Sequence, residues 1–190
     1  MSATEMLFRA DAYRREAPAR VLAHADGAVV PDGSLFYPTG GGQPGDSGAL
    51  HWEGGEMAVA DTVKGDRGSI RLVPAEGAAP PPVGTEVVQR LDWARRHMHM
   101  RVHTALHLLS VVIPLPVTGG AIGAGKGRLD FDMPESPGDK AALEEALNDL
   151  IARDLPVTEE WIDEAELDAL PDLVKTMSVA PPRGTGRVRL

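Results

Sequence analysis

Two histidines at helical spacing form the most specific candidate site for chemistry in this sequence. His103 and His107 lie four residues apart. In an α-helix, residues at this spacing share one face and lie one turn apart, so both imidazole rings can reach one point in space and bind a single zinc ion. Thr104 stands where the metalloprotease form of the motif has a catalytic glutamate, so the pair does not indicate a zinc protease. The alternative is a partly buried helix whose histidines only bond to their neighbours.

The residues around the pair predict the helix that must position it. Apolar side chains recur every three or four residues from Met98 to Ile113, which is the period of an α-helix. Asp92 can cap the start, and Pro114 and Pro116 prevent continuation. His99 lies on the same stripe, but three successive turns do not easily converge on one ion. The sequence therefore predicts one helix, between Asp92 and Pro114, that presents two candidate metal ligands.

A glycine-rich segment, residues 36–48 (FYPTGGGQPGDSG), is a second candidate for binding. Consecutive glycines let the backbone approach a ligand closely and direct amide hydrogens at it, as in anion-binding nests. On this basis Gly40, Gly41, Gly42 and Gln43 are candidate substrate-binding residues. An ordinary glycine-rich turn is the alternative.

A second glycine-rich stretch resembles a nucleotide-binding loop only in part. The pattern G-x-x-x-x-G-K begins at Gly120, but Gly127 stands where a P-loop needs a serine or threonine to hold magnesium. Residues 128–133 then alternate polar and apolar side chains, which predicts a strand where a P-loop requires a helix. We therefore reject a nucleoside-triphosphate site.

Composition and charge narrow the classes of function. The 190 residues include no cysteine, which excludes disulfides, thiol nucleophiles and cysteine zinc ligands within them. The net charge of −9 argues against a general nucleic-acid-binding protein. Residues 135–172, however, hold 13 of the acids and only two bases, and the arginines near the histidines, Arg95, Arg96 and Arg101, can form a local basic surface. Without a membrane span or a secretory signal, we expect a cytoplasmic protein with no membrane partner.

The distribution of elements predicts an α+β protein with two domains. Short β-rich runs separated by turn residues fill the first half, at residues 21–30, 35–37, 57–63, 70–73 and 86–91. We predict a small β-barrel-like domain over residues 1–91 and an α/β domain over residues 92–190. In the second domain, Ser136 is the expected N-cap of a helix with a regular apolar face, and short strands are expected at residues 157–162 and 187–190.

Four stretches, in this order, resemble the free-standing alanyl-tRNA editing proteins called AlaX and the matching editing domain of alanyl-tRNA synthetase. They are residues 36–48, 103–107 (HTALH), 128–132 (RLDFD) and 181–190 (PPRGTGRVRL). The resemblance covers nearly the whole chain. It implies a β-barrel-like domain followed by a two-layer α/β editing domain of the kind common to threonyl- and alanyl-tRNA synthetases.

The resemblance also implies an activity and a metal. The family hydrolyses the ester that joins a wrong amino acid, usually serine and sometimes glycine, to the tRNA for alanine. It implies that His103 and His107 are two ligands of Zn²⁺, while in the family a C-x-x-x-H motif follows the strand that begins here at Arg187. The chain ends before that motif. Either these residues are part of a longer protein, which we favour, or this member lacks the metal.

The expected substrate is aminoacylated tRNA for alanine, hydrolysed in trans and without ATP. A threonine hydroxyl can distinguish a seryl from an alanyl ester, and Thr118, Thr104 and Thr39 are the candidates. Arg95, Arg96 and Arg101 are candidate contacts to tRNA phosphates. Two other functions stay open: an inactive module that binds aminoacyl-tRNA or a partner protein, and a small-molecule metallohydrolase. The sequence does not indicate an oligomeric state.

Overall fold

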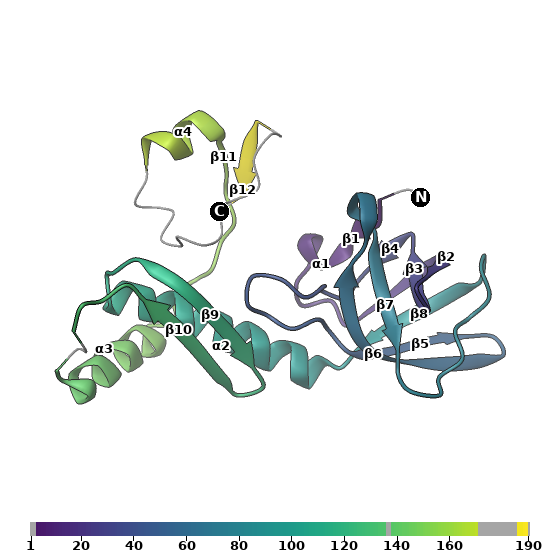
Figure 1. The fold of residues 1–190 in the computed structure, drawn as a ribbon, viewed down its shortest axis with the longest axis horizontal. Helices are drawn as coiled ribbons and strands as arrows, with labels where there is room; N and C mark the ends of the chain where they lie inside the picture. Colours follow the sequence, from purple (N-terminus) through teal and green to yellow (C-terminus); the bar gives the residue numbers. More distant parts are fainter. Residues whose placement is uncertain (1–2, 136–137, 171–185, 190) are drawn as a thin grey trace. The chain divides into compact units, whose positions relative to one another are not determined.

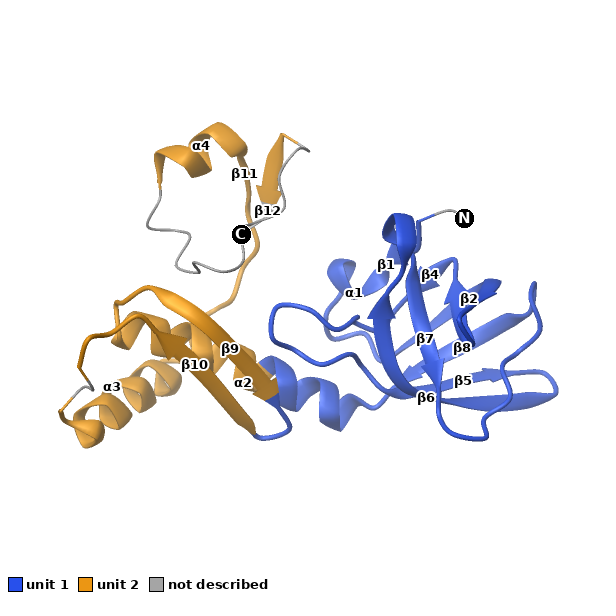
Figure 2. Ribbon diagram, in the orientation of Figure 1, with its two compact units in different colours: residues 1–100, 123–125 blue, residues 101–122, 126–190 orange. Residues whose placement is uncertain are grey.

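The structure, a computed structural model, describes residues 3–135, 138–170 and 186–189 (Figure 1). The chain forms two compact units (Figure 2): residues 1–100 with 123–125, and residues 101–122 with 126–190. Helix α2 (Trp93–Val112) begins in the first unit and continues in the second. The limits of 1–91 and 92–190 stay a prediction.

The first unit is built on a closed barrel of six antiparallel strands in the order β2-β3-β7-β6-β5-β8. The strands are β2 (Glu16–Ala25), β3 (Ala28–Pro31), β5 (Gly48–Trp52), β6 (Gly55–Lys64), β7 (Ile70–Pro74) and β8 (Glu86–Leu91). Short elements accompany them: β1 (Glu5–Met6), α1 (Leu7–Ala10), β4 (Gly33–Ser34) and a 3-10 turn at Asp66–Gly68. The predicted barrel-like domain is therefore confirmed.

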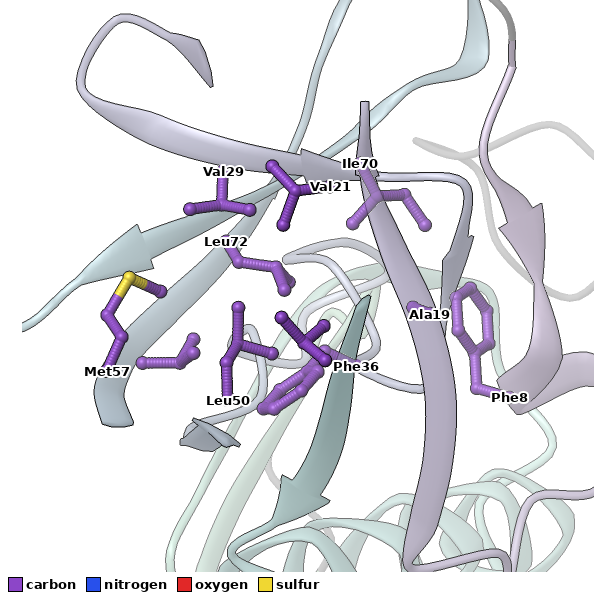
Figure 3. Packing of buried hydrophobic residues seen from close by; sticks show 11 residues of the cluster. Phe8, Ala19, Val21, Val29, Phe36, Leu50, Met57, Ile70 and Leu72 are labelled. Carbon is purple, nitrogen blue, oxygen red and sulfur yellow. The ribbon is translucent and has the colours of Figure 1, made fainter. Parts of the chain in front are cut away.

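Local sequence accounts for the turns and the core of this barrel. Asp26 and Gly27 take φ angles of 51° and 77°, which suits the tight turn between β2 and β3. Side chains alternate along the strands, as a sheet with one buried face requires. Leu50, Met57 and Leu72 meet in the interior, all fully buried (Figure 3). Burial of these side chains from several strands stabilises the closed barrel.

The second unit mixes helices with two-stranded sheets. After the second half of α2 come β9 (Val117–Gly123), β10 (Lys126–Phe131), α3 (Lys140–Ala152), β11 (Trp161–Asp163), α4 (Glu164–Ala169) and β12 (Arg187–Arg189). Strand β9 pairs with β10, and β11 pairs with β12 in antiparallel fashion. The predicted α+β class is thus confirmed, and β10 is the strand expected at residues 128–133 in place of a P-loop helix.

Strand β10 packs closely against α2 at one glycine. A Cβ atom on Gly127 would lie 2.7 Å from Cγ1 of Val102 and 3.1 Å from both methyl carbons of Leu106. A distance under 3 Å is a steric clash, so the backbone of β10 comes this close to the helix only because residue 127 has no side chain. Close packing of β10 against α2 therefore explains why residue 127, where a P-loop would need a serine or threonine, is a glycine.

One predicted strand is wrong. Residues 35–37 are buried or half-buried but are not a strand, because side chains and not a neighbouring strand accept their amide hydrogens. The amide of Leu35 donates to Oε1 of the buried Gln89 at 3.0 Å, and that of Phe36 donates to Oγ of Ser34 at 3.2 Å. The apolar pattern indicated burial correctly, but it could not show where the backbone hydrogen bonds go.

The boundaries of other elements also differ from expectation. Helix α3 begins at Lys140 and is capped by Asp139, whose Oδ1 accepts from the amide of Ala142 at 3.0 Å; the expected cap, Ser136, lies outside the described residues. Strand β11 covers only Trp161–Asp163, and β5 was not predicted as a strand. In the part of the chain that is described, no helix has the length and apolar character needed to cross a membrane.

Candidate functional site

Helix α2 begins where the sequence predicts. The carboxylate of Asp92 accepts a hydrogen bond from the amide of Arg95 at 3.1 Å, which is N-cap geometry, and the amide of Asp92 donates to the carbonyl of Ser47 at 2.8 Å. The second bond joins the helix start to the end of the glycine-rich segment. The helix ends at Val112, before Pro114, as expected.

The tip of the glycine-rich segment is a tight turn. Gly40 and Gln43 exchange two backbone hydrogen bonds, of 3.0 and 3.1 Å, across Gly41 and Gly42. Gly41 and Gly42 have φ angles of 60° and 77°, which other residues rarely adopt, and both are exposed. Gln43 is buried. The amides of Gly40 and Gln43 are thus committed to the turn, while the backbone of Gly41 and Gly42 is presented to solvent.

A buried ion pair anchors this segment to α2. Asp46, 1% exposed, pairs with Arg96, 4% exposed, although the two residues are 50 positions apart. The same carboxylate accepts from the amide of Tyr37 at 2.7 Å, and Nη1 of Arg95 donates to the carbonyl of Gly45 at 2.6 Å. The first turns of the helix are therefore bonded to the glycine-rich segment by side chains as well as by the backbone.

Steric fit strengthens this anchor. A Cβ atom on Gly45 would lie 2.1 Å from the carbonyl oxygen of Thr62 and 2.3 Å from Oδ1 of Asp61, so only glycine can occupy the position. The hydroxyl of Thr62 donates to the carbonyl of Asp46 at 2.9 Å. Strand β6 thus holds the segment from the side of the barrel.

Burial governs the electrostatics of the anchor. It raises the pKa of the Asp46 carboxyl, and the guanidinium of Arg96 acts in the opposite direction. Burial likewise raises the pKa of Tyr37, whose hydroxyl donates to the carbonyl of Gly40 at 3.0 Å. His99 is 1% exposed, and burial lowers its pKa, with a further decrease from nearby Arg95. An uncharged His99 therefore belongs to the barrel-side packing of α2.

The predicted phosphate contact by Arg96 needs correction. Its guanidinium is buried and paired with Asp46, so it is not on the surface that a phosphate would approach. Arg95 is half-buried and bonded to Gly45, whereas Arg101 is exposed. Among the three arginines, Arg101 keeps the exposure that a phosphate contact requires, and its role stays a prediction.

The two histidines of the motif lie side by side on the second half of α2. The rings of His103 and His107 are 5.0 Å apart between centroids and 17° from parallel. His103 is half-buried and His107 is exposed. Burial, and secondarily the neighbouring His107, lower the pKa of His103, which favours the neutral imidazole that binds metals. The two imidazoles thus lie on one helix face and close together, so that rotation about their side-chain bonds could direct one nitrogen of each ring at a single ion.

The fit to zinc is that of a partial site. Among the described residues, no group of three or more histidine, cysteine, aspartate and glutamate side chains is placed to hold a metal ion. Catalytic zinc sites usually have three protein ligands and an open position. His103 and His107 can therefore supply two ligands, and a third must come from outside the described residues or from the substrate or water. Zinc binding stays a prediction.

The candidate threonines have different surroundings. Oγ1 of Thr39 accepts from the amide of Gly45 at 2.9 Å, so its hydroxyl takes part in the fold of the glycine-rich segment. Thr104 and Thr118 are exposed, on α2 and β9 respectively. Their exposure is compatible with contact to a ligand, and the assignment of a specificity residue stays a prediction.

Sequence reasoning did not find the Asp46–Arg96 pair. Asp46 was part of a glycine-rich motif and Arg96 of a basic stretch, and each looked like an exposed residue of its class. The available signal was the burial expected of position 96, which lies three residues before the buried His99 on the same side of the helix. A charge on the buried stripe of a helix requires a partner.

Comparison with known proteins shows the family. The family described as "tRNA synthetases class II (A)" matches residues 4–95. An alanyl-tRNA editing protein AlaX-M of Saccharolobus solfataricus is 30% identical over 186 residues, which are 95% of this chain and 78% of that protein. The AlaX-M protein of Methanosarcina acetivorans is 39% identical over 81% of this chain and 67% of its own length. This chain belongs to the AlaX family of alanyl-tRNA editing proteins.

The match to longer relatives is partial. An alanine–tRNA ligase of Pyrobaculum neutrophilum is 39% identical over 176 residues, which are 87% of this AlaX chain but 19% of the ligase. The AlaX-M protein of Pyrococcus horikoshii is 38% identical, and the matched part is 70% of this chain and 62% of that protein. The chain thus spans about a fifth of the ligase and about three fifths of this AlaX-M protein.

Proposed function

We propose that this protein is a trans-editing hydrolase that deacylates mischarged tRNA for alanine and so contributes to the fidelity of translation. Family membership supports this proposal, since several AlaX relatives are named alanyl-tRNA editing proteins. The observation that carries it is the pair of stacked rings of His103 and His107. The pair provides adjacent imidazoles on an accessible helix face, which suits a metal-assisted hydrolysis.

In this proposal, His103 and His107 hold Zn²⁺. The bound ion would supply Lewis-acid chemistry, by polarising a water molecule or orienting the aminoacyl ester. The protein residues do the rest: the burial of His103 keeps its ring neutral for binding, and exposed His107 lies open to a ligand. The exposed backbone of Gly41 and Gly42 is suited to close approach by a ligand.

The proposed substrate is the seryl, and secondarily the glycyl, ester. Discrimination against the correct alanyl ester requires a group that bonds the serine hydroxyl, and exposed Thr104 and Thr118 are the candidates. A site that must bond a hydroxyl can reject an analogue without it by about 10⁴-fold to 10⁵-fold, so this discrimination accounts for the seryl ester and not for the glycyl ester. Arg101 is the candidate contact to a phosphate of the tRNA.

Deacylation of seryl, glycyl and alanyl esters on tRNA for alanine tests the proposal. We expect the seryl ester to be hydrolysed and the alanyl ester to be spared. The variant His103→Ala should lose both bound zinc and deacylation, while His51→Ala, which changes a histidine paired with Glu56 on the barrel, should retain both. Binding of the aminoacyl-tRNA without hydrolysis would instead support an inactive binding module, and hydrolysis of small esters alone would support a metallohydrolase of another class.

A further inference from the structure

A group of aromatic rings and an arginine lies on the surface of the first unit, outside the histidine pair. Tyr13, between α1 and β2, is 64% exposed, although tyrosine usually buries most of its ring. Its ring lies 5.7 Å from that of Trp93 and 6.2 Å from that of His97. Trp93 and His97, one turn apart on α2, stack at 5.2 Å with 10° between their planes.

A cation completes this group, which we call the aromatic platform and define as Tyr13, Arg15, Trp93 and His97. The guanidinium carbon of Arg15 lies 4.7 Å from the centroid of the Trp93 ring, within the range of a cation–π interaction. The platform therefore joins three rings and one cation from two segments that are distant in sequence.

Hydrogen bonds order the segment that carries Tyr13 and Arg15, and helix α2 carries Trp93 and His97. The amide of Tyr13 donates to Oδ1 of Asp11 at 2.9 Å, and Trp93 is the first residue of α2. Nε of Arg14 donates to the carbonyl of Glu16 at 2.9 Å, so the segment before β2 is bonded to its own strand. A ligand that stacks here would lose less binding energy to ordering of the side chains than it would on flexible ones.

The charge around the platform is opposite to that of the whole protein. Residues 9–16, which include Tyr13 and Arg15, contain three arginines and two acids, whereas the whole chain has a net charge of −9. Exposed rings beside arginines are the combination with which proteins bind single-stranded nucleic acid: the rings stack on bases and the cations attract phosphates. An apolar protein partner would need neither the guanidinium on the ring nor the local positive charge.

We infer that the aromatic platform is a stacking site for an unpaired nucleotide of RNA, with Tyr13 as the ring that meets the base. This inference rests on the proposed function, because it takes the unpaired nucleotide to belong to the tRNA substrate. Arg15 contributes positive charge next to the base and its phosphate, while Trp93 and His97, on α2, pack beside the ring of Tyr13. The platform adds a binding surface for the RNA and takes no part in the hydrolysis.

The test measures binding of a fluorescently labelled, single-stranded RNA of 12 nucleotides to the full chain, with the same RNA in a duplex for comparison. Stacking of one base is worth about 1–3 kcal/mol, so Tyr13→Ala should raise the Kd for the single strand by about 5-fold to 150-fold. Tyr13→Phe keeps the ring and should bind like the wild type. Arg20→Ala removes an exposed arginine of β2 away from the platform, and it controls for a general loss of charge.

A second readout reports the contact itself. In a protein with Trp52→Phe and Trp161→Phe, Trp93 is the only remaining tryptophan, and RNA binding should quench its fluorescence. Tyr13→Ala should abolish most of this quenching while its thermal unfolding stays that of the parent, because the tyrosine ring is mainly exposed. The duplex should quench weakly.

The outcomes separate this inference from the proposed function. Equal Kd values for the wild type and Tyr13→Ala, or failure of the wild type to bind the single strand, would overturn the platform even if seryl-tRNA is deacylated. Tyr13-dependent binding and quenching without deacylation would support the platform and refute the hydrolase. If both hold, Tyr13→Ala should raise KM for seryl-tRNA and leave kcat unchanged. If Arg20→Ala weakens RNA binding as much as Tyr13→Ala does, the loss reflects charge in general, and the stacking role of Tyr13 is contradicted.

Discussion

His99 and His107 lie on one helix, two intervals of four residues apart, and their surroundings are opposite. His99 is buried in the first unit beside the Asp46–Arg96 pair, and burial lowers its pKa. His107 is exposed in the second unit and stacks with His103. The same regular spacing therefore places two kinds of polar residue on α2. His99 and Arg96 are buried in the first unit, whereas His103 and His107 are accessible to a ligand.

The largest effect should come from breaking the buried anchor. Asp46→Ala leaves the guanidinium of Arg96 buried without its carboxylate, which typically costs about 3–5 kcal/mol. Urea unfolding should show this loss in the free energy of unfolding. Glu16→Ala is the matched control, because Glu16 pairs with Arg90 at 2.9 Å while both side chains are more than half exposed, and an exposed pair contributes about 0–1 kcal/mol. Similar losses in the two variants would contradict the distinction between buried and exposed pairs.

The two histidine variants should differ in their free energy of unfolding by less than the two ion-pair variants do. His99→Ala empties a buried position and should cost about 2–3 kcal/mol of stability, whereas His107→Ala changes an exposed side chain and should cost no more than about 0.5 kcal/mol. Zinc binding should respond in the reverse order: it should be lost in His107→Ala and kept in His99→Ala. Thermal unfolding and metal analysis of both variants check this, and loss of zinc in His99→Ala alone would reverse our assignment.

The close contact between β10 and α2 predicts an effect of intermediate to small size. Gly127→Ala places a methyl group against Cγ1 of Val102, a stiff β-branched side chain, and should destabilise the protein by about 1–2 kcal/mol. Gly125→Ala, at a turn with open space around it but a φ angle of 71°, is a control for backbone strain alone. Chemical unfolding measures both, and a neutral Gly127→Ala would show that the strand can move away from the helix.

The smallest effect should be the contribution of His99 to pH dependence. Its pKa in the folded protein is lowered by burial and by Arg95 and Arg96, against which Asp46 and Asp92 act, so below pH 6.5 the unfolded chain takes up the proton first. Stability from His99 is therefore complete above pH 6.5 and is lost as the pH falls towards the lowered folded pKa. In His99→Gln, the free energy of unfolding should fall less between pH 7 and pH 5. An equal or steeper fall would exclude a buried neutral imidazole.

Several features could be predicted from local sequence. The limits of α2 follow from Asp92, the apolar period and Pro114, and the barrel strands follow from alternation between turn residues. Residues 35–37 could not be assigned, because the amides of Leu35 and Tyr37 bond to the side chains of Gln89 and Asp46, which only the folded chain brings close, and that of Phe36 bonds to the neighbouring Ser34. The predicted phosphate contact by Arg96 was wrong for the same reason, since the partner of Arg96 is 50 residues away.

By itself, the sequence determined which residues can share a face of α2, because helical periodicity depends only on neighbours three and four positions apart. It therefore determined that His99, His103 and His107 are aligned, and that Gly41 and Gly42 favour a tight turn. Only the tertiary structure decided which of the aligned groups are buried and which are open to solvent. Burial depends on segments that are distant in the chain, and it changes the free energy of a charged group more than any local pattern does.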